Sequence, residues 1–449
     1  MGIANDEFDE REHRERIEYI ERQLARLVAE GADAQATVRA SLDQRMAEDG
    51  VPGVSVAVIE GGRIAWARGY GVMEAGQPER VTPATLFQCA SISKPVAAVV
   101  ALRLVESGAL TLDEDVNERL TSWKIPPITY WNEQGRVDMR PRITVRQLLS
   151  HTAGLTVHGF PGYPVDAPLP HLTEILNGEP RANTPPIRLD SLPGVQMRYS
   201  GGGYTVLTQL LQDVTGQTFP ALARELALDP LGMSASGYEQ PLPPQRAHLA
   251  ARAHRTQRQP VPGGWHVYPE LAPDGLWAPP ADLARFALGL QAALRGEPGA
   301  ILSAATVREM MTPQAPELGV EAVGLGVFLS GEGETARFRH SGGNDGFSCE
   351  LAAYQRHGQG AVVMTNSDDG WFLILEIVNA IADAYVWPDY QPFRLSGAWS
   401  APNDTMYAAV AGAYADGSGR RCVIEVSGDA LWLRCGEQPP LPLEHHTAT

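Results

Sequence analysis

A short polar motif at the head of an apolar helix is the feature that most constrains how this chain can fold. Ser91-Ile92-Ser93-Lys94-Pro95 precedes the run Val96–Ser107, which is apolar nearly throughout, and Gly108 follows. Proline has no amide hydrogen and fits only the first turn of a helix, so the helix is predicted to begin near Ser91. Because a helix that is apolar on all sides is normally buried, we expect the fold to enclose this helix with the polar motif at its N-terminus.

The spacing of Ser91 and Lys94 is typical of a nucleophile with a nearby base. Residues three apart lie on one face of a helix, so the lysine is expected beside the serine hydroxyl. Free amides at a helix N-terminus favour the negative charge of an oxyanion, and burial can lower the pKa of a lysine towards that of a general base. Lys94 and Lys124 are the only lysines among 36 basic residues. Since arginine cannot lose its proton, a lysine retained here favours a catalytic role over a chance S-x-x-K match.

Composition excludes several classes of protein. The 449 residues are 44% hydrophobic and 20% charged, which is typical of a globular chain, and the net charge is −17. This charge argues against nucleic acid and against an anionic membrane surface as partners. The sequence has no apolar run of membrane-spanning length and no signal-peptide pattern at its acidic N-terminus, so a cytoplasmic protein is expected. None of the four cysteines forms a C-x-x-C pair, and no metal site is predicted.

The order of predicted elements indicates an α/β (α+β) fold. A charged amphipathic helix over residues 6–30 could pack on its own domain or on a second subunit, which would make a homo-oligomer. A helix over 35–48 and a hairpin of Val54–Ile59 and Arg63–Tyr70 follow. The chain is then helical and rich in loops over about 86–286. Four strands and a helix over 371–385 complete the pattern, with the strands at Gly324–Leu329, Thr335–His340, Ser348–Tyr354 and Gly360–Asn366. We therefore predict an antiparallel sheet flanked by terminal helices, with an inserted all-helical subdomain.

Several segments together resemble the serine β-lactamase and penicillin-binding-protein superfamily. Besides the Ser91–Pro95 motif, four segments are similar to segments of this superfamily, namely Val51–Val58, Ile143–Leu155, Pro230–Met233 and Gly275–Trp277. The chain is most similar to the class C-like branch, which contains class C β-lactamases, family VIII carboxylesterases, D-aminopeptidases and S12-type D-peptidases. The resemblance covers about residues 35–387 and implies a β-lactamase/transpeptidase-like fold. The predicted domains are a charged helix (1–34), the hydrolase domain (35–387) and a short β-rich appendage (388–449).

The resemblance assigns roles to a second motif, Tyr199-Ser200-Gly201, which matches the family's Tyr-x-Asn. It implies that Tyr199 relays a proton beside Lys94 and that Ser200 contacts substrate. A phenol beside an ammonium group is expected to have a lowered pKa and to accept the nucleophile's proton. Gly201 replaces the asparagine that contacts the substrate amide in the family, which argues against efficient β-lactam hydrolysis.

A third motif, His340-Ser341-Gly342-Gly343, matches the family's Lys-Thr-Gly or His-x-Gly. By resemblance, His340 is a polar catalytic group near the substrate, and the amides of Ser91 and Gly343 form the oxyanion hole. Ser341 and Gly342 are expected to bind substrate, since glycine lets it approach the strand closely. We expect His340 to be neutral at pH 7–8, because the Lys94 ammonium would lower its pKa.

These residues predict a serine hydrolase that forms an acyl-enzyme on small esters, amides or peptides. No metal or organic cofactor is implied. Within this class the sequence leaves an S12-type peptidase and an esterase open. The alternative is a weakly hydrolytic penicillin-binding or scaffold protein that keeps the fold.

Overall fold

A computed structural model describes residues 13–27, 38–132, 135–315 and 322–394, together with four C-terminal strands. The chain divides into two compact units, one formed by Met1–Arg26 and Val38–Pro392 and the other by Leu27–Thr37 and Phe393–Thr449. All predicted site residues belong to the first unit.

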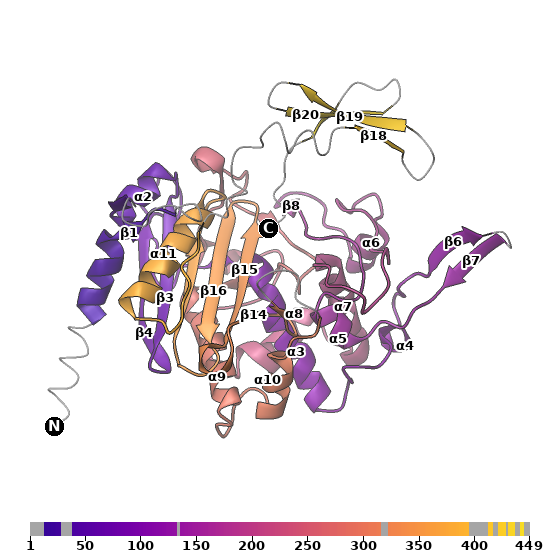
Figure 1. Cartoon of the computed structure of the whole chain (residues 1–449), viewed down its shortest axis with the longest axis horizontal. Coiled ribbons are helices and arrows are strands. Elements are labelled where there is room, and N and C mark those ends of the chain that lie inside the picture. The colour runs from indigo at the N-terminus through magenta and orange to yellow at the C-terminus, as the bar shows by residue number, and fades with distance from the viewer. Residues whose placement is uncertain are drawn as a thin grey trace. The chain divides into compact units, whose positions relative to one another are not determined.

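A seven-stranded antiparallel sheet forms the frame of the first unit (Figure 1). In spatial order its strands are β13 (Ala322–Val323), β14 (Phe328–Ser330), β15 (Arg337–Asn344), β16 (Phe347–Tyr354), β17 (Gly360–Thr365), β3 (Gly53–Glu60) and β4 (Arg63–Gly71). The predicted hairpin and antiparallel sheet are confirmed. Strand β15 continues four residues beyond the predicted end at His340, because residues 341–344 pair in register with residues 347–350 of β16.

Two long helices pack against the central strands and bury them. Helix α9 (Pro280–Leu294) contacts β3, β4, β16 and β17, and α11 (Gly370–Ala384) contacts β16 and β17. All residues of β16 and β17 are buried, which explains their nearly continuous apolar sequence. The predicted helix over 371–385 is confirmed as α11.

The insert between β4 and α9 is largely helical and is built around the predicted buried helix. That helix, α3 (Ser93–Glu106), is continued at its N-terminus by the 3₁₀ turn η2 (Ala90–Ile92). The other helices of the insert are α4 (Val116–Arg119), α5 (Val145–Leu149), α6 (Leu172–Asn177), α7 (Gly201–Thr215) and α8 (Phe219–Ala223). The prediction of an all-helical insert is wrong, because the insert also contains strands. Three two-residue pairs are β5 (Phe87–Gln88) with β12 (Trp277–Ala278), β8 (Tyr163–Pro164) with β11 (His266–Val267), and β9 (His254–Arg255) with β10 (Gln259–Pro260). A hairpin of β6 (Ile128–Asn132) and β7 (Gly135–Met139) projects from the insert, and its β-branched and aromatic residues favour strands.

The N-terminal helix ends earlier than the predicted residue 30. Among the described residues it covers 13–22 and buries Ile17 and Ile20, after which β1 (Leu24–Ala25) pairs with β2 (Arg39–Ala40). This pairing turns Leu24 into a strand residue although its spacing fits the helical stripe. The predicted helix over 35–48 begins only at α2 (Leu42–Glu48), because Ser41 caps it, and the residues before 38 lie outside the described part. Phe8, which belongs to the helix predicted over residues 6–30, also lies outside the described residues.

The second unit contains an antiparallel sheet in the order β18 (Gly412–Ala415), β19 (Arg421–Ser427), β20 (Ala430–Cys435) and β21 (Leu441–Leu443). Cys422 stands opposite Cys435 in the β19–β20 register.

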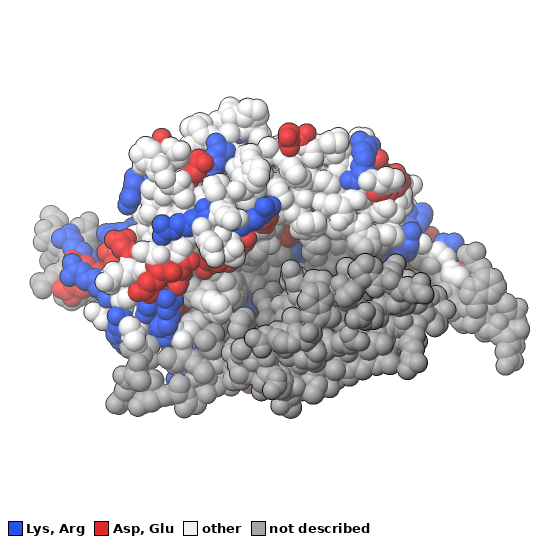
Figure 2. All heavy atoms as spheres, turned by 90° about the horizontal axis from the view of Figure 1, so that it is seen from above, with Lys and Arg blue, Asp and Glu red and all other residues white. Residues whose placement is uncertain are grey.

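Charges of both signs alternate over the described surface shown in Figure 2, where arginines lie beside aspartates and glutamates. This face therefore presents no extended basic patch of the kind that binds nucleic acid. In the part of the chain that the structure describes, no helix has both the length and the apolar character needed to cross a bilayer.

Candidate active site

Ser91 lies in a strained turn at the head of the buried helix. The preceding residue, Ala90, has φ of 45°, a left-handed conformation that costs free energy in a non-glycine residue and often marks a functional site. Ser91 is partly exposed, whereas its neighbours Ile92 and Ser93 are fully buried. The Ser93 hydroxyl accepts a hydrogen bond from the Leu276 amide at 3.0 Å, so it faces away from Ser91 Oγ.

Lys94 is fully buried and its ammonium group contacts the nucleophile directly. Its Nζ lies 2.7 Å from Ser91 Oγ, 3.0 Å from the Pro273 carbonyl oxygen and 3.4 Å from Asp274 Oδ1. The predicted pairing of Ser91 with Lys94 is thus present in the structure. The other lysine, Lys124, is exposed and donates to the Asn117 carbonyl.

Asp274 is a buried carboxylate in this site that sequence reasoning missed. Its Oδ1 accepts a hydrogen bond from Ser91 Oγ at 3.1 Å, in addition to its contact with Lys94. The backbone places it there, because Cys89 donates to the Leu276 carbonyl at 2.8 Å. Asn344 of β15 also donates to the Asp274 carbonyl at 3.2 Å. The one sequence signal was its position directly before the Gly275–Trp277 landmark.

The carboxylate reverses the protonation state predicted for Lys94. Burial by itself lowers the pKa of Lys94, but the adjacent Asp274 and Tyr199 outweigh it and raise the pKa above its usual value. The expectation that desolvation turns this lysine into a free base is therefore wrong. Lys94 is a cation in the resting site.

Tyr199 lies over Lys94 in a cluster of aromatic rings. Lys94 Nζ is 5.0 Å from the centre of the Tyr199 ring, and the tyrosine hydroxyl interacts with Lys94 and Ser91. The ring stacks on His151 at 4.2 Å and lies 4.9 Å from His158. Burial raises the pKa of Tyr199 by more than Lys94 lowers it, so the predicted lowering is also wrong. The phenol is therefore neutral and is able to donate a proton.

Residues 156–160 pack against the start of helix α7, at position 201, where the family has its asparagine. Gly201 donates its amide to the His158 carbonyl at 2.9 Å, and Ser200 Oγ donates to the Thr156 carbonyl at 2.9 Å. Val157 is held at φ of 66°, which is strained for a β-branched residue. A Cβ atom at Gly201 would lie 2.9 Å from the Phe160 ring and 3.0 Å from the His158 carbonyl oxygen. A side chain at this position would therefore require the Phe160 ring and the His158 carbonyl to shift.

Ser200 caps helix α7, and its predicted contact with substrate stays a prediction. It is the N-cap of α7, where its hydroxyl accepts from the Gly203 amide at 2.9 Å, and its own amide donates to His151 Nδ1 at 3.1 Å. The side chain is buried, and its hydrogen bonds stabilise the start of the helix that directly follows Tyr199.

His340 is buried on β15 near Tyr199 and Phe328. Their ring centres lie 6.1 Å and 5.3 Å from that of His340. Its Nδ1 is 2.6 Å from the Ser341 carbonyl oxygen, which can only accept, so Nδ1 carries the proton and Nε2 is an acceptor. Burial, and after it the charge of Lys94, lower the pKa of His340 to about 3. The prediction of a neutral histidine is confirmed.

The two glycines after Ser341 differ in function. A Cβ at Gly342 would lie 2.5 Å from the Cys89 carbonyl oxygen and 2.6 Å from Cys349 Sγ. Gly342 thus lets β15 approach the nucleophile turn, and its predicted contact with substrate stays a prediction. Gly343 is exposed, and a Cβ there would meet no atom of the described chain within 4 Å. Open space therefore borders the strand edge beside Ser91's turn.

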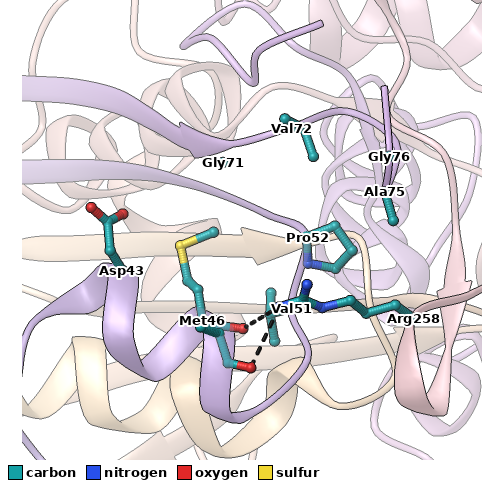
Figure 3. Close-up of a pocket in the computed structure, with 10 residues that line it drawn as sticks. Asp43, Met46, Val51, Pro52, Gly71, Val72, Ala75, Gly76 and Arg258 are labelled. Carbon is teal, nitrogen blue, oxygen red and sulfur yellow. Dashed lines mark hydrogen bonds between the residues drawn. The ribbon is translucent and has the colours of Figure 1, made fainter. Parts of the chain in front are cut away.

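A cavity of about 230 Å³ lies elsewhere in the unit, between α2 and the start and end of the β3–β4 hairpin (Figure 3). Met46, Val51 and Pro52 contribute its apolar wall, and Arg258 donates to the Met46 carbonyl at 3.4 Å. No predicted site residue lines this cavity, so the candidate active site remains at Ser91.

Comparison with known proteins agrees with this geometry. The family model described as Beta-lactamase matches residues 38–379. Protein flp of Staphylococcus aureus (strain MRSA252) is 26% identical over 213 residues, which cover 46% of this chain and 39% of that protein. Esterase EstB of Burkholderia gladioli is 30% identical over 243 residues, which cover 52% of this chain and 58% of the esterase. The chain therefore matches less than two thirds of the length of either relative.

The fold also matches solved structures. The octameric penicillin-binding protein homologue from Pyrococcus abyssi superposes with a TM-score of 0.62 at 22% identity, over 89% of this chain and 88% of that one. At this level of identity the likeness establishes the fold.

Proposed function

The chain belongs to the Beta-lactamase family and has its fold, and on that premise we propose that it is a serine hydrolase that cleaves small neutral esters and amides through an acyl-enzyme on Ser91. The observation that carries the proposal is the direct contact of Ser91 Oγ with Lys94 Nζ at 2.7 Å, at the head of a buried helix. A hydroxyl fixed beside a cation and a carboxylate is the arrangement of an activated nucleophile.

The remaining site residues take the following parts in this proposal. Ser91 Oγ attacks the carbonyl carbon, and the amides of Ser91 and Gly343 stabilise the oxyanion. The open space beside Gly343 supports this assignment, since it leaves room for the substrate carbonyl. The neutral phenol of Tyr199 donates a proton to the leaving group and regains one from Lys94.

The state of His340 favours neutral substrates. Its Nε2 presents a lone pair, it is buried, and it has no hydrogen-bond partner among the described residues. A substrate hydroxyl or amide hydrogen can donate to this atom, whereas a carboxylate would be repelled by it. The family alternative in which a cation at this position binds a substrate carboxylate is therefore disfavoured. Esterase EstB, as its name states, is an esterase, which supports an acyl-ester substrate for this chain as well.

A matched pair of substrates tests this proposal. The value of kcat/KM is measured for p-nitrophenyl esters with and without a carboxylate on the acyl chain, alongside nitrocefin and D- and L-aminoacyl amides. We expect the neutral short-chain ester to be preferred at pH 7–8. Preference for the carboxylated ester would contradict the proposed specificity. Labelling of Ser91 without turnover of any substrate would favour the penicillin-binding or scaffold alternative.

Self-assembly and location stay predictions for this chain. The octameric state belongs to the Pyrococcus abyssi protein. Light scattering on the purified chain tests whether it forms a homo-oligomer, and fractionation of cells tests the predicted cytoplasmic location.

A further inference from the structure

We propose that Asp274 is the catalytic residue that takes the proton from Ser91, while Lys94 remains a cation that orients the nucleophile. This inference rests on the proposed function, because it assigns the base in the same acylation step. Asp274 touches the reacting atom itself, since its Oδ1 lies 3.1 Å from Ser91 Oγ.

The hydrogen-bond pattern gives the direction of the Ser91 proton. An ammonium group has three hydrogens and no acceptor, and besides the Tyr199 hydroxyl Lys94 has three acceptors within hydrogen-bond distance. These are Ser91 Oγ at 2.7 Å, the Pro273 carbonyl at 3.0 Å and Asp274 Oδ1 at 3.4 Å. Because Lys94 donates to Ser91 Oγ, the serine hydrogen must point elsewhere. It points to Asp274 Oδ1 at 3.1 Å, while the Tyr199 hydroxyl beside it belongs to a neutral phenol.

The other titratable groups near Asp274 are poorer acceptors in the resting site. Tyr199 and Tyr268 are neutral phenols, and burial raises their pKa values. Burial raises the pKa of Glu270 to about 8 and the pKa of the Cys349 thiol further above its usual value. His158 packs against the Tyr199 ring, with the ring centres 4.9 Å apart, and burial lowers its pKa. The positive charge facing Asp274 therefore comes from Lys94, whose Nζ lies 3.4 Å from Asp274 Oδ1.

The proposed step balances in protons and bonds. As Ser91 Oγ forms its bond to the substrate carbonyl carbon, the Oγ–H bond breaks and the proton moves to Asp274 Oδ1. The carbonyl electron pair moves to its oxygen and makes the oxyanion. When the tetrahedral intermediate collapses, the bond to the leaving group breaks and that group takes a proton from Tyr199. Lys94 returns a proton to Tyr199, and Asp274 returns one to Lys94.

The same carboxylate can act in deacylation. Once Ser91 is acylated it no longer donates to Oδ1, which then accepts a proton from the attacking water. That proton returns to Ser91 Oγ as the acyl bond breaks. Asp274 Oδ2 is buried and has no hydrogen-bond partner among the described residues, so a second acceptor position is available to orient this water.

The test compares Asp274→Asn and Asp274→Ala with wild type, using hydrolysis of a neutral p-nitrophenyl ester from pH 5.5 to 9 and the rate of covalent labelling by a fluorophosphonate. Asparagine preserves the shape of the side chain but cannot take the proton. We expect kcat/KM and the labelling rate to fall by roughly 10²–10⁴-fold at every pH in Asp274→Asn. Sodium formate should restore part of the activity of Asp274→Ala in proportion to its concentration.

Glu270→Gln is the matched control. It alters a buried carboxyl four residues away that is already protonated at neutral pH, and we expect its kcat/KM to equal that of wild type. Circular dichroism and thermal unfolding establish that each variant is folded.

Two results would overturn the assignment. If folded Asp274→Asn keeps its maximal kcat/KM within tenfold of wild type, with only the pH at which activity begins shifted, then Lys94 is the base. If activity is lost but formate never restores it in Asp274→Ala, then Asp274 only positions Lys94. Either result leaves the proposed function intact, whereas a wild-type protein that is neither labelled on Ser91 nor active would refute the function itself.

Discussion

Replacing His340 with glutamine should remove part of the acid sensitivity of the catalytic unit. The pKa of His340 is about 3 in the folded protein, and that of an unperturbed histidine is about 6.5. Between these values the unfolded chain binds a proton that the folded chain does not, so the free energy of unfolding falls as the pH falls. The stability that neutral His340 permits is fully present above about pH 6.5 and is lost progressively below it.

The size of the effect follows from the two pKa values. Each pH unit between them changes the free energy of unfolding by about 1.4 kcal/mol, and lowering the pH from 7.5 to 4.5 costs wild type about 2.7 kcal/mol through His340 alone. His340→Gln cannot titrate and should escape this loss. The buried histidines His151 and His254 also have lowered pKa values, but they are present in both proteins and cancel in the comparison.

Urea unfolding of wild type and His340→Gln at pH 7.5 and 4.5, followed by tryptophan fluorescence, measures this difference. The gap in unfolding free energy between the two proteins should move by about 2.7 kcal/mol in favour of the variant at the lower pH. An unchanged gap would show that His340 is not held neutral, and would remove the argument against a substrate carboxylate at this position.

Four further substitutions test the geometry around Ser91. Lys94→Arg should lower kcat/KM by roughly 10²–10⁴-fold despite keeping the charge, since a guanidinium group cannot pass a proton to Tyr199, and near-normal turnover would reduce Lys94 to an electrostatic role. Gly342→Ala should lower the free energy of unfolding by about 1–3 kcal/mol, because its Cβ would meet the Cys89 carbonyl at 2.5 Å. Gly343→Ala is its control in the same urea assay and should unfold like wild type, because its Cβ meets no described atom within 4 Å. Gly201→Asn should destabilise the protein and leave its affinity for β-lactams unimproved, because Phe160 and the His158 carbonyl occupy the required space; a gain in nitrocefin affinity would contradict this.

The sequence predicted most of the frame because its signals are local. The apolar run after Pro95 and the alternation around Gly61-Gly62 each specify an element without reference to the rest of the chain. The errors fall where strand pairing, rather than the local sequence, decides the secondary structure. Leu24 fits a helical stripe but pairs with Ala40, and β15 continues past His340 because β16 offers partners for four more residues.

The site was predictable only as far as its motifs extend. Ser91, Lys94 and Tyr199 were found because each belongs to a recognisable pattern, and the structure brings them together. Asp274 lies 180 residues from Lys94 in sequence, and its place depends on the hydrogen bond between Cys89 and Leu276. The pKa shifts of Lys94 and Tyr199 were both predicted in the wrong direction. The sequence did not show the Asp274 carboxylate, which raises the pKa of Lys94, or the burial that raises the pKa of Tyr199.

Covalent labelling of the nucleophile tests the central claim most directly. Wild type and Ser91→Ala are incubated with a fluorophosphonate, and the intact mass and the peptide carrying residue 91 are measured by mass spectrometry. The account predicts one adduct on Ser91 in wild type and none in Ser91→Ala, since the neighbouring Ser93 is buried and bonded to the Leu276 amide. An adduct on another residue, or labelling of the alanine variant at the wild-type rate, would contradict it.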